Sequence, residues 1–295
     1  MRTIVSDLDG TIAFGGRRPA RSIRSALFAL AAAPDTRVVL ATSRTPRCVG
    51  DWFGPRAHRF DLVCCNGALV VRRSGTAPAR GSGAHAAPTA AVTRTAIPAT
   101  AVGHIVATLG AAGAAYCLEY GHEFVATDHD SLPWWGARHR RVLAPGRVPD
   151  LVGVVKVTVA HSQGWARTFE ALEGVDVFPH ETGDMDVVAS GVDKAAALAG
   201  LLDGARTAVL AFGNDRNDLA LLRAADRAVV VGTGLAELDE LPTVRRVAAS
   251  PDAVLTALRA GVRQLMDVVP AGRAVASTAM APPAAAMPPV SAASR

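Results

Sequence analysis

Apolar positions in the first part of the chain follow two different periods. Those of residues 21–33 recur at helical spacing, and Pro34 ends the pattern. Shorter runs rich in valine and leucine flank this segment and predict buried strands. These runs are residues 3–5, 37–40 and 60–64. The N-terminal region is therefore predicted to alternate strands with helices.

The same alternation returns near the end of the chain. Residues 207–212 and 228–231 predict strands, while 193–202 and 251–258 predict helices. Strands that alternate with helices favour a mostly parallel sheet covered on both faces. We therefore predict an α/β fold with a Rossmann-like, doubly wound core, formed by residues 1–74 and 186–267.

The middle of the chain has a different pattern. Residues 74–101 are rich in Ala, Gly, Pro, Ser and Thr, which marks an exit from the first domain. A helix over 99–109 and several short strands follow, at 115–119, 123–126, 151–160 and 175–178. Residues 75–185 are therefore predicted to form an inserted α+β domain. The Ala- and Pro-rich tail, 268–295, is expected to be disordered.

Composition and charge narrow the function classes. The 295 residues are 50% hydrophobic, which is enough to bury a core. The net charge is +5 and the pI about 9.5, but the arginines are scattered, so we expect no nucleic-acid partner. No window is apolar enough to span a membrane, and Arg2, Asp7 and Asp9 leave no room for an apolar signal region. A soluble, cytoplasmic protein is expected.

Cysteine and lysine usage adds two observations. The four cysteines contain no C-x-x-C pair, so free thiols are favoured over a zinc site or disulfides. Lysine is rare, with only Lys156 and Lys194 in a chain dominated by arginine. In such a chain, each lysine is a candidate for a specific role.

Two carboxylates follow the first predicted strand. Asp7 and Asp9 are one residue apart, and Gly10 then allows a tight turn. Alternate residues of a strand share a face, so the two side chains would lie together and repel each other. A hard cation such as Mg²⁺ would relieve that repulsion. The alternative interpretation is an ordinary acidic turn.

Polar groups also follow the other predicted strands. Thr42 ends the second strand, where a hydroxyl and backbone N–H groups can bind a phosphoryl oxygen, or where it can cap the next helix. Asn66 begins an Asn-Gly turn after the third strand, either as a plain hairpin or facing a substrate. Lys194 starts a helix, and residues 213–218 add acidic and amide oxygens.

Four of these stretches occur in an order known from one enzyme family. The stretches 7–11 (Asp-Leu-Asp-Gly-Thr), 40–44, Lys194 and 213–218 resemble the motifs of haloacid dehalogenase-type phosphatases. The resemblance covers about residues 2–260 and points to the Cof-type, subclass IIB group with a C2 cap domain. It implies that the inserted domain is this cap and that the strand near 185–188 returns to the core.

The resemblance implies a role for each motif residue. Asp7 would be the nucleophile and Asp9 the general acid and base. Thr42 and Lys194 would neutralise the transferring phosphoryl group. Further substrate-binding positions are Ser43, Arg44, Asn66 and Asn217. Relatives commonly have glycine where this chain has Ser43, so the site is expected to be narrower or to gain a donor.

The expected metal ligands show one departure from the family pattern. Mg²⁺ would be held by Asp7, by the backbone carbonyl of Asp9 and by the 213–218 motif. Relatives usually carry Asp where this chain has Asn214, whose amide oxygen brings no charge. Asp215 could compensate, and Asp218 remains a third candidate ligand. Weaker metal binding is expected.

One segment of the inserted domain combines aromatic and cationic residues. Residues 131–141 contain two tryptophans and three arginines, among them Trp134 and Arg138. Rings and guanidinium groups together suit a polar or phosphorylated substrate. The alternative is a loop that packs its tryptophans on the inserted domain.

These observations predict a Mg²⁺-dependent phosphatase. The substrate would be a small phosphomonoester, with sugar phosphates implied by the cap type, and the intermediate a phosphoaspartate. A phosphomutase or phosphotransferase would use the same aspartate but exclude water. A weakly catalytic protein that binds a phosphorylated ligand is a third reading, given Asn214. We expect a monomer or a homodimer.

Overall fold

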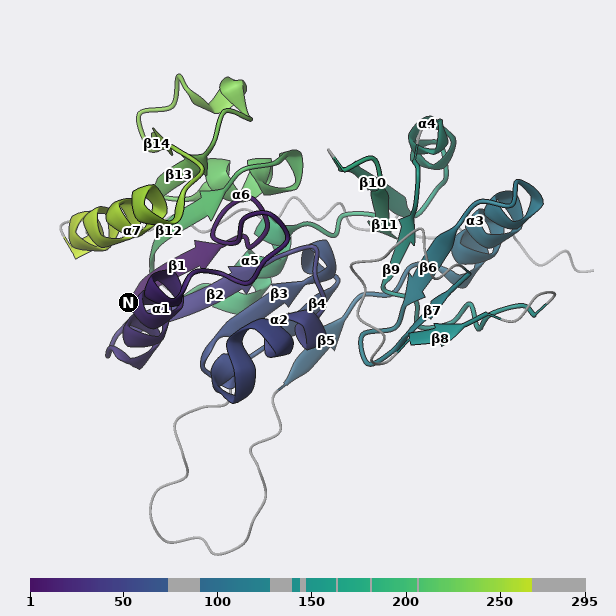
Figure 1. Ribbon diagram of the computed structural model, residues 1–295, viewed down its shortest axis with the longest axis horizontal. Helices are drawn as coiled ribbons and strands as arrows, with labels where there is room; N and C mark the ends of the chain where they lie inside the picture. The colour runs from purple at the N-terminus through teal and green to yellow at the C-terminus, as the bar shows by residue number, and fades with distance from the viewer. Residues whose placement is uncertain are drawn as a thin grey trace, which may run out of the picture.

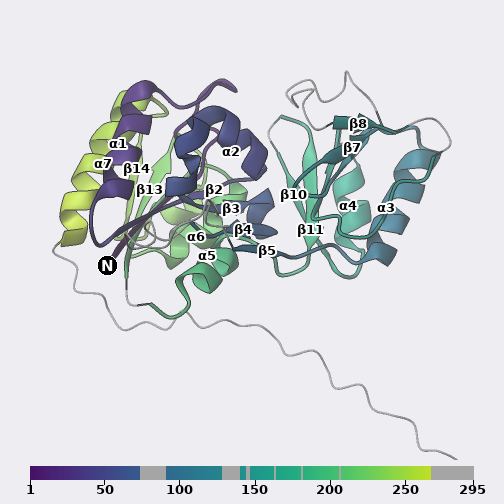
Figure 2. The ribbon, with the colours of Figure 1, turned by 90° about the horizontal axis from the view of Figure 1, so that it is seen from below.

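A computed structural model shows a chain built around two β-sheets (Figure 1). The structure describes residues 1–73, 91–127, 140–143, 147–162, 164–180, 182–205 and 207–266. Seen from below, the two sheets and their helices form two bodies that lie side by side (Figure 2). We call them the larger and the smaller domain.

The larger domain contains an eight-stranded sheet in the order β14-β13-β12-β1-β2-β3-β4-β5. The pairs from β14 to β3 are parallel, and β4 and β5 continue antiparallel. The strand bounds are β1 Arg2–Ser6, β2 Thr36–Ala41, β3 Asp61–Cys64, β4 Leu69–Val71, β5 Val92–Arg94, β12 Ala208–Gly213, β13 Arg227–Val231 and β14 Val244–Val247. The mostly parallel sheet confirms the predicted fold class.

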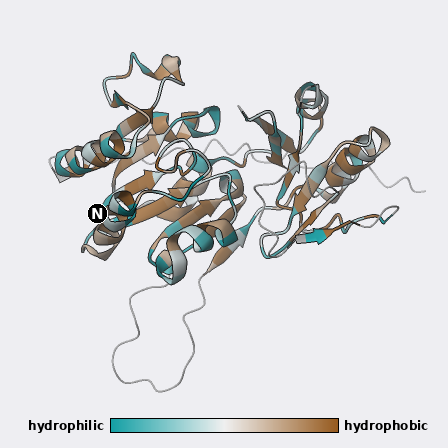
Figure 3. Ribbon diagram, in the orientation of Figure 1, coloured by the Kyte–Doolittle hydropathy of each residue, from teal (hydrophilic) through white to brown (hydrophobic). Residues whose placement is uncertain are grey.

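Helices cover both faces of this sheet. Side chains alternate along β1, so that Ile4 packs with the α1 and α7 side and Val5 with the α5 and α6 side. The helices are α1 Arg21–Ala32, α2 Pro46–Phe53, α5 Lys194–Leu202, α6 Leu219–Ala224 and α7 Pro251–Met266, and short 3₁₀ turns are η1 Gly54–Arg59, η2 Cys65–Gly67, η3 Arg216–Asp218 and η4 Ala236–Leu238. Figure 3 shows hydrophobic central strands beneath helices with mixed surfaces. The doubly wound arrangement is therefore present.

The smaller domain contains a six-stranded sheet in the order β10-β11-β9-β6-β7-β8. Its strands are β6 Tyr116–Glu119, β7 Phe124–Ala126, β8 Arg140–Val142, β9 Lys156–Val159, β10 Val175–Pro179 and β11 Met185–Ala189, and its helices are α3 Ala99–Ala111 and α4 Trp165–Glu170. The domain has its own core, in which Ile105 and Phe169 are fully buried. The prediction that the inserted domain has an α+β fold is confirmed.

Both predicted domain boundaries need correction. Strand β5 belongs to the larger sheet, so the chain leaves that domain after Arg94 and not at residue 74. Strand β11 pairs with β9 and β10 in the smaller sheet, so it is not a strand of the larger domain. The return lies between Ala189 and Lys194. The predicted linker within 74–90 and the tail from 268 lie outside the described residues.

No described helix combines the length and the apolar character that spanning a bilayer requires.

The predicted Asn66-Gly67 hairpin is present between β3 and β4, which pair antiparallel. Asn66 has φ 56° and Gly67 φ +112°, both in the left-handed region. A Cβ atom on Gly67 would lie 2.4 Å from the carbonyl oxygen of Asp193. Glycine is therefore required here for its backbone conformation and for the close approach of the segment before α5.

We expect Gly67→Ala to lower the free energy of unfolding by about 1–3 kcal/mol, because it adds backbone strain and a steric clash. Gly50→Ala is the control, since Gly50 lies in α2 with nothing within 4 Å of an added Cβ. That change should be neutral or stabilising by up to about 1 kcal/mol. Urea unfolding of both variants measures the difference, and equal midpoints would contradict the assignment.

Candidate active site

The predicted site residues gather at one edge of the larger sheet. Strand β1 lies between β2 and β12, and all three run parallel. Asp7 follows β1, Thr42 follows β2 and Asn214 follows β12. The carboxyl ends of parallel strands are where such sheets carry their sites. The fold thus brings three distant motifs together.

A buried lysine joins two of these motifs. Lys194 Nζ donates to Asp7 Oδ1 at 2.8 Å and to Asp218 Oδ1 at 2.7 Å. Lys194 is 1% exposed and Asp218 fully buried. The other oxygen of Asp218 accepts the backbone N–H groups of Asn214 and Asp215, at 3.0 and 3.3 Å. Asp218 therefore holds Lys194 and the turn after β12, and both its oxygens are engaged.

Burial changes the proton affinity of the Asp7 carboxylate. Desolvation raises the pKa of Asp7 to about 7, with Lys194 opposing and Asp218 and Asp9 reinforcing the rise. Burial would lower the pKa of Lys194, but Asp218 and Asp7 outweigh it and raise the value. Lys194 therefore remains a cation, while Asp7 needs a further positive charge to stay fully ionised at neutral pH.

The second aspartate of the motif is held by an arginine. Arg44 Nε and one of its amino groups donate to the two oxygens of Asp9, at 2.6 and 2.9 Å. The guanidinium also lies over the ring of Trp52, 4.1 Å from its centre. The bidentate bond and the stacking fix the direction of Asp9.

Thr42 organises the turn that carries Arg44. It is fully buried, its hydroxyl accepts the Arg44 backbone N–H at 3.1 Å, and its carbonyl accepts the Asn66 N–H. It does not cap α2, because the N-cap is Thr45, whose side chain accepts from Cys48. A hydroxyl that accepts one bond can still donate its own proton to a phosphoryl oxygen.

Asn214 and Asp215 supply oxygen atoms beside Asp9. Asn214 Oδ1 accepts the Thr11 hydroxyl at 2.8 Å, and an oxygen of Asp215 accepts the Arg216 N–H at 2.7 Å. A Cβ atom on Gly10 would lie 2.4 Å from Asn214 Nδ2, so glycine lets this amide approach the Asp7–Asp9 turn. Among the described residues, no three His, Cys, Asp or Glu side chains are grouped to hold a metal ion.

These donors fit a cation that keeps some of its water. Mg²⁺ commonly uses one or two carboxylates and completes its shell with water and substrate oxygens. Asp7 and Asp215 offer carboxylates, Asn214 an amide oxygen and Asp9 a backbone carbonyl. The set suits such an ion and does not suit a metal that needs a closed protein cage.

A cavity of about 490 Å³ lies between the two domains above these residues. From the larger domain, Asp9, Arg44 and Asp215 line it, whereas Asp7 is nearly enclosed at 5% exposure. From the smaller domain, Lys156 and Asp184 are among the lining side chains. A ligand here would touch both domains.

Comparison with known proteins identifies the family to which the chain belongs. A model of the haloacid dehalogenase-like hydrolases matches residues 4–80 and 151–258, more than half of the chain. The chain belongs to the haloacid dehalogenase-like hydrolases. None of the curated proteins is significantly similar to it.

Solved structures share the fold of this hydrolase. A haloacid dehalogenase-like hydrolase from Bacteroides thetaiotaomicron is 19% identical with a TM-score of 0.69, covering 88% of this chain and 98% of that one. A phosphatase of the superfamily from the same organism is 17% identical (TM-score 0.68; 88% and 94% covered). A subclass IIB sugar phosphatase is 16% identical (TM-score 0.68; 89% and 99% covered). At these identities the likeness shows the fold alone.

The smaller domain of the hydrolase adds a second buried ion pair. Lys156 Nζ lies 2.9 Å from Asp186 and donates to the Ser43 carbonyl of the larger domain at 3.0 Å. Asp186 also accepts from Asn66 Nδ2 at 3.2 Å, and His180 lies 3.1 Å away. Burial would raise the pKa of Asp186, but Lys156 and His180 outweigh it and lower the value. This cluster connects the domains.

The two predicted amides lie in that connection. Asn217 Nδ2 donates to Asn66 Oδ1 at 3.0 Å, and Asn66 in turn donates to Asp186. Asn66 is 1% exposed, so it forms the hairpin and joins the domains at once. A direct contact of Asn66 or Asn217 with substrate stays a prediction.

Sequence reasoning missed most of the domain contacts. Arg47 of α2 donates to both oxygens of Glu119 in β6, at 2.9 and 2.7 Å. Neither residue lies in a recognisable motif, and neither do Asp186 and His180. The rarity of lysine was the one usable signal, because both lysines of the chain are buried at this site.

The predicted aromatic and cationic segment stays untested. Trp134 and Arg138 lie outside the described residues. Arg141 in β8 pairs with Glu123, the residue before β7, at 2.6 Å, and the Arg141 side chain is 63% exposed. The described end of this segment therefore interacts within the smaller domain.

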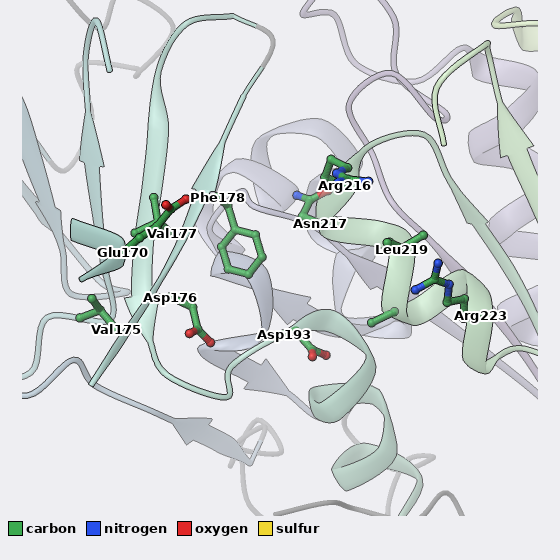
Figure 4. A pocket seen from close by; sticks show the side chains of 11 residues that line it. Glu170, Val175, Asp176, Val177, Phe178, Asp193, Arg216, Asn217, Leu219 and Arg223 are labelled. Atoms are coloured by element: carbon green, nitrogen blue, oxygen red, sulfur yellow. The ribbon is translucent and has the colours of Figure 1, made fainter. Parts of the chain in front are cut away.

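A second cleft between the domains, of about 470 Å³, is lined by Arg216 and Asn217 of the 213–218 motif but not by Asp7, Asp9, Thr42 or Lys194 (Figure 4). Figure 4 shows Phe178 of β10 facing Asn217 and Arg216 across it. Two of its three carboxylates have structural partners, since Asp176 accepts the Gly191 N–H and Asp193 caps α5. The chemistry is therefore assigned to the first cavity.

We expect Asp186→Asn to lower the free energy of unfolding by about 3–5 kcal/mol, because it leaves the ammonium of Lys156 buried without its charge partner. Glu123→Gln breaks an exposed ion pair and is the control, with an expected change of about 1 kcal/mol or less. Urea unfolding monitored by far-UV circular dichroism measures both. Similar decreases in the free energy of unfolding of the two variants would show that the buried cluster stabilises the protein no more than an exposed ion pair does.

Proposed function

We propose that this hydrolase is a Mg²⁺-dependent phosphatase that removes the phosphoryl group of a small phosphomonoester through a phosphoaspartate on Asp7. The observation that carries the proposal is the enclosed Asp7–Lys194–Asp218 group with Asp9 two residues from Asp7. In this proposal the carboxylate beside the fixed cation, Asp7, is the nucleophile, and Asp9 is the acid and base.

The first step is attack of an Asp7 oxygen on phosphorus. The bond to the leaving oxygen breaks, and Asp9 gives that oxygen a proton. Lys194 and the Thr42 hydroxyl stabilise the charge on the transferring group. Asp9 then takes a proton from a water molecule, which attacks the phosphoaspartate, releases inorganic phosphate and restores Asp7.

The Asp9–Arg44 pair sets a condition on this cycle. Arg44 donates to both oxygens of Asp9, so it can turn to a phosphoryl oxygen only by releasing at least one of these bonds. If Arg44 has its predicted role, the pair therefore loosens when substrate enters.

Asp7, the Asp9 backbone carbonyl, Asn214 and Asp215 would hold Mg²⁺. The bound ion would supply positive charge to the phosphoryl oxygens and keep Asp7 ionised. Asp218 is not expected to be a ligand, because Lys194 and two backbone N–H groups occupy its oxygens.

Two features support a sugar phosphate as the substrate. The cavity has the volume for a hexose, and its smaller-domain wall offers hydroxyl, ammonium and carboxylate groups, from Thr158, Lys156 and Asp184. A protein of the same fold is a subclass IIB sugar phosphatase. A small phosphorylated substrate remains the proposed partner.

Asp7→Asn should reduce release of phosphate from p-nitrophenyl phosphate by roughly a thousandfold or more, because an amide is not a nucleophile. Asp9→Asn should cost about a hundredfold or more and allow phosphorylated Asp7 to accumulate. Asp252→Asn, an exposed change in α7, is the control for both. Steady-state assays and intact mass spectrometry provide the readouts. Wild-type rates in Asp7→Asn would contradict the covalent mechanism.

Asn214→Asp should lower the Mg²⁺ concentration needed for half-maximal activity by about tenfold, because it adds a charged ligand. The titration starts from enzyme treated with EDTA, and isothermal calorimetry of Mg²⁺ binding gives an independent readout. Turnover that persists in EDTA would contradict a metal-dependent mechanism. Tight binding of a phosphorylated ligand without Mg²⁺-dependent turnover would favour a binding protein.

A further inference from the structure

The charges that line the main cavity are not balanced. Three permanent cations occur among its described lining residues, and each already has a carboxylate partner: Arg44 has Asp9, Arg47 has Glu119 and Lys156 has Asp186. His180 also faces Asp186. Among the described residues that line the cavity, no cation is therefore left without a carboxylate.

Three lining carboxylates form no ion pair with a described residue. They are Asp51, Asp184 and Asp215. Asp51 is exposed, and Asp215 is one of the residues proposed to hold the metal. Asp184 differs from both, because it belongs to the smaller domain and is 8% exposed.

The local structure holds Asp184 in place. It is the last residue before β11, and its backbone carbonyl accepts the His180 N–H at 2.9 Å across the turn from β10. The Thr182 hydroxyl donates to one of its oxygens. The carboxylate is thus positioned by the hairpin and forms no salt bridge with a described residue. Burial would lower the pKa of His180, but Asp186, assisted by Asp184, raises it, so Asp184 acts on this ring through space.

A nearly buried carboxylate without a cation is costly unless a ligand supplies the missing partner. A protonated amine would satisfy it best, a hydroxyl would satisfy it with a neutral hydrogen bond, and a second anion would be repelled. The direction of selectivity follows from this charge imbalance.

We propose that the cavity selects phosphomonoesters whose leaving group carries an amine, accepts those with hydroxyl groups alone, and rejects those with a second anionic group, and that Asp184 is the specificity-determining residue. This inference rests on the proposed phosphatase function. It narrows the substrate class to amino sugars or amino alcohols bearing one phosphate.

The test uses three hexose derivatives of equal length: glucosamine, glucose and gluconate, each phosphorylated at the sixth carbon. With the wild-type enzyme and Mg²⁺ at neutral pH, kcat/KM should fall in that order, by about tenfold at each step, which corresponds to about 1.4 kcal/mol. p-Nitrophenyl phosphate is assayed alongside as the general phosphatase probe.

Asp184→Asn keeps the shape of the side chain and removes its charge. The ratio of kcat/KM between the amine and the carboxylate substrates should then shrink by about tenfold or more. Glu170→Gln, an exposed change at the second cleft, is the matched control and should leave the ratio unchanged. A thermal melt of each variant confirms that it is folded.

The outcomes separate the two proposals. Hydrolysis of the gluconate derivative as fast as that of glucose would overturn the inference while the phosphatase function stands. The predicted order with an unchanged ratio in folded Asp184→Asn would overturn the role of Asp184. No hydrolysis of any probe, p-nitrophenyl phosphate included, would overturn the proposed function itself. If Asp184→Asn does not fold, the wild-type order alone decides the selectivity.

Discussion

The site depends on one buried ammonium group between two carboxylates. Lys194 bonds to Asp7 and Asp218, which follow different strands, so the ends of β1 and β12 and the start of α5 must meet within hydrogen-bond distance. Removing one partner from such a group leaves an uncompensated buried charge. When both carboxylates are ionised, their charge exceeds that of the one ammonium group, and this residual negative charge would favour the proposed divalent cation.

Contacts from the smaller domain also support the turn after β2, which carries Arg44, the partner of Asp9. The turn after β2 is held on one side by Asp9, through Arg44, and on the other by Lys156, through the Ser43 carbonyl. Asn66 adds a bridge to Asp186. The direction of Asp9, the proposed acid and base, is therefore tied to the docking of the inserted domain, even though Asp7, Asp9, Thr42 and Lys194 all belong to the larger one.

A feature could be predicted from the sequence when it depends on neighbouring residues, and not when it depends on contacts between distant parts of the chain. Asp7, Thr42 and Lys194 could be placed because each directly follows a strand or begins a helix, and Asp9 because it lies two residues after Asp7. These are local signals. The contact of Arg47 with Glu119 could not, since it forms only after two separately folded sheets dock. Strand β11 was misassigned because a buried central strand shows the same apolar run in either sheet. The role of Asn66 in joining the two domains could not be predicted either, because a turn signal does not show which groups the side chain bonds to.

The scarcity of lysine has a practical consequence. Lys156 and Lys194 are the only lysines of the chain, and they are 6% and 1% exposed. Reagents that acylate primary amines should find neither while the two domains are docked. Lys156 sits at the junction, so its labelling would report separation of the domains, whereas labelling of Lys194 requires the larger domain to open around β1 and α5. The hydrolase thus carries two built-in chemical reporters, one for domain movement and one for unfolding.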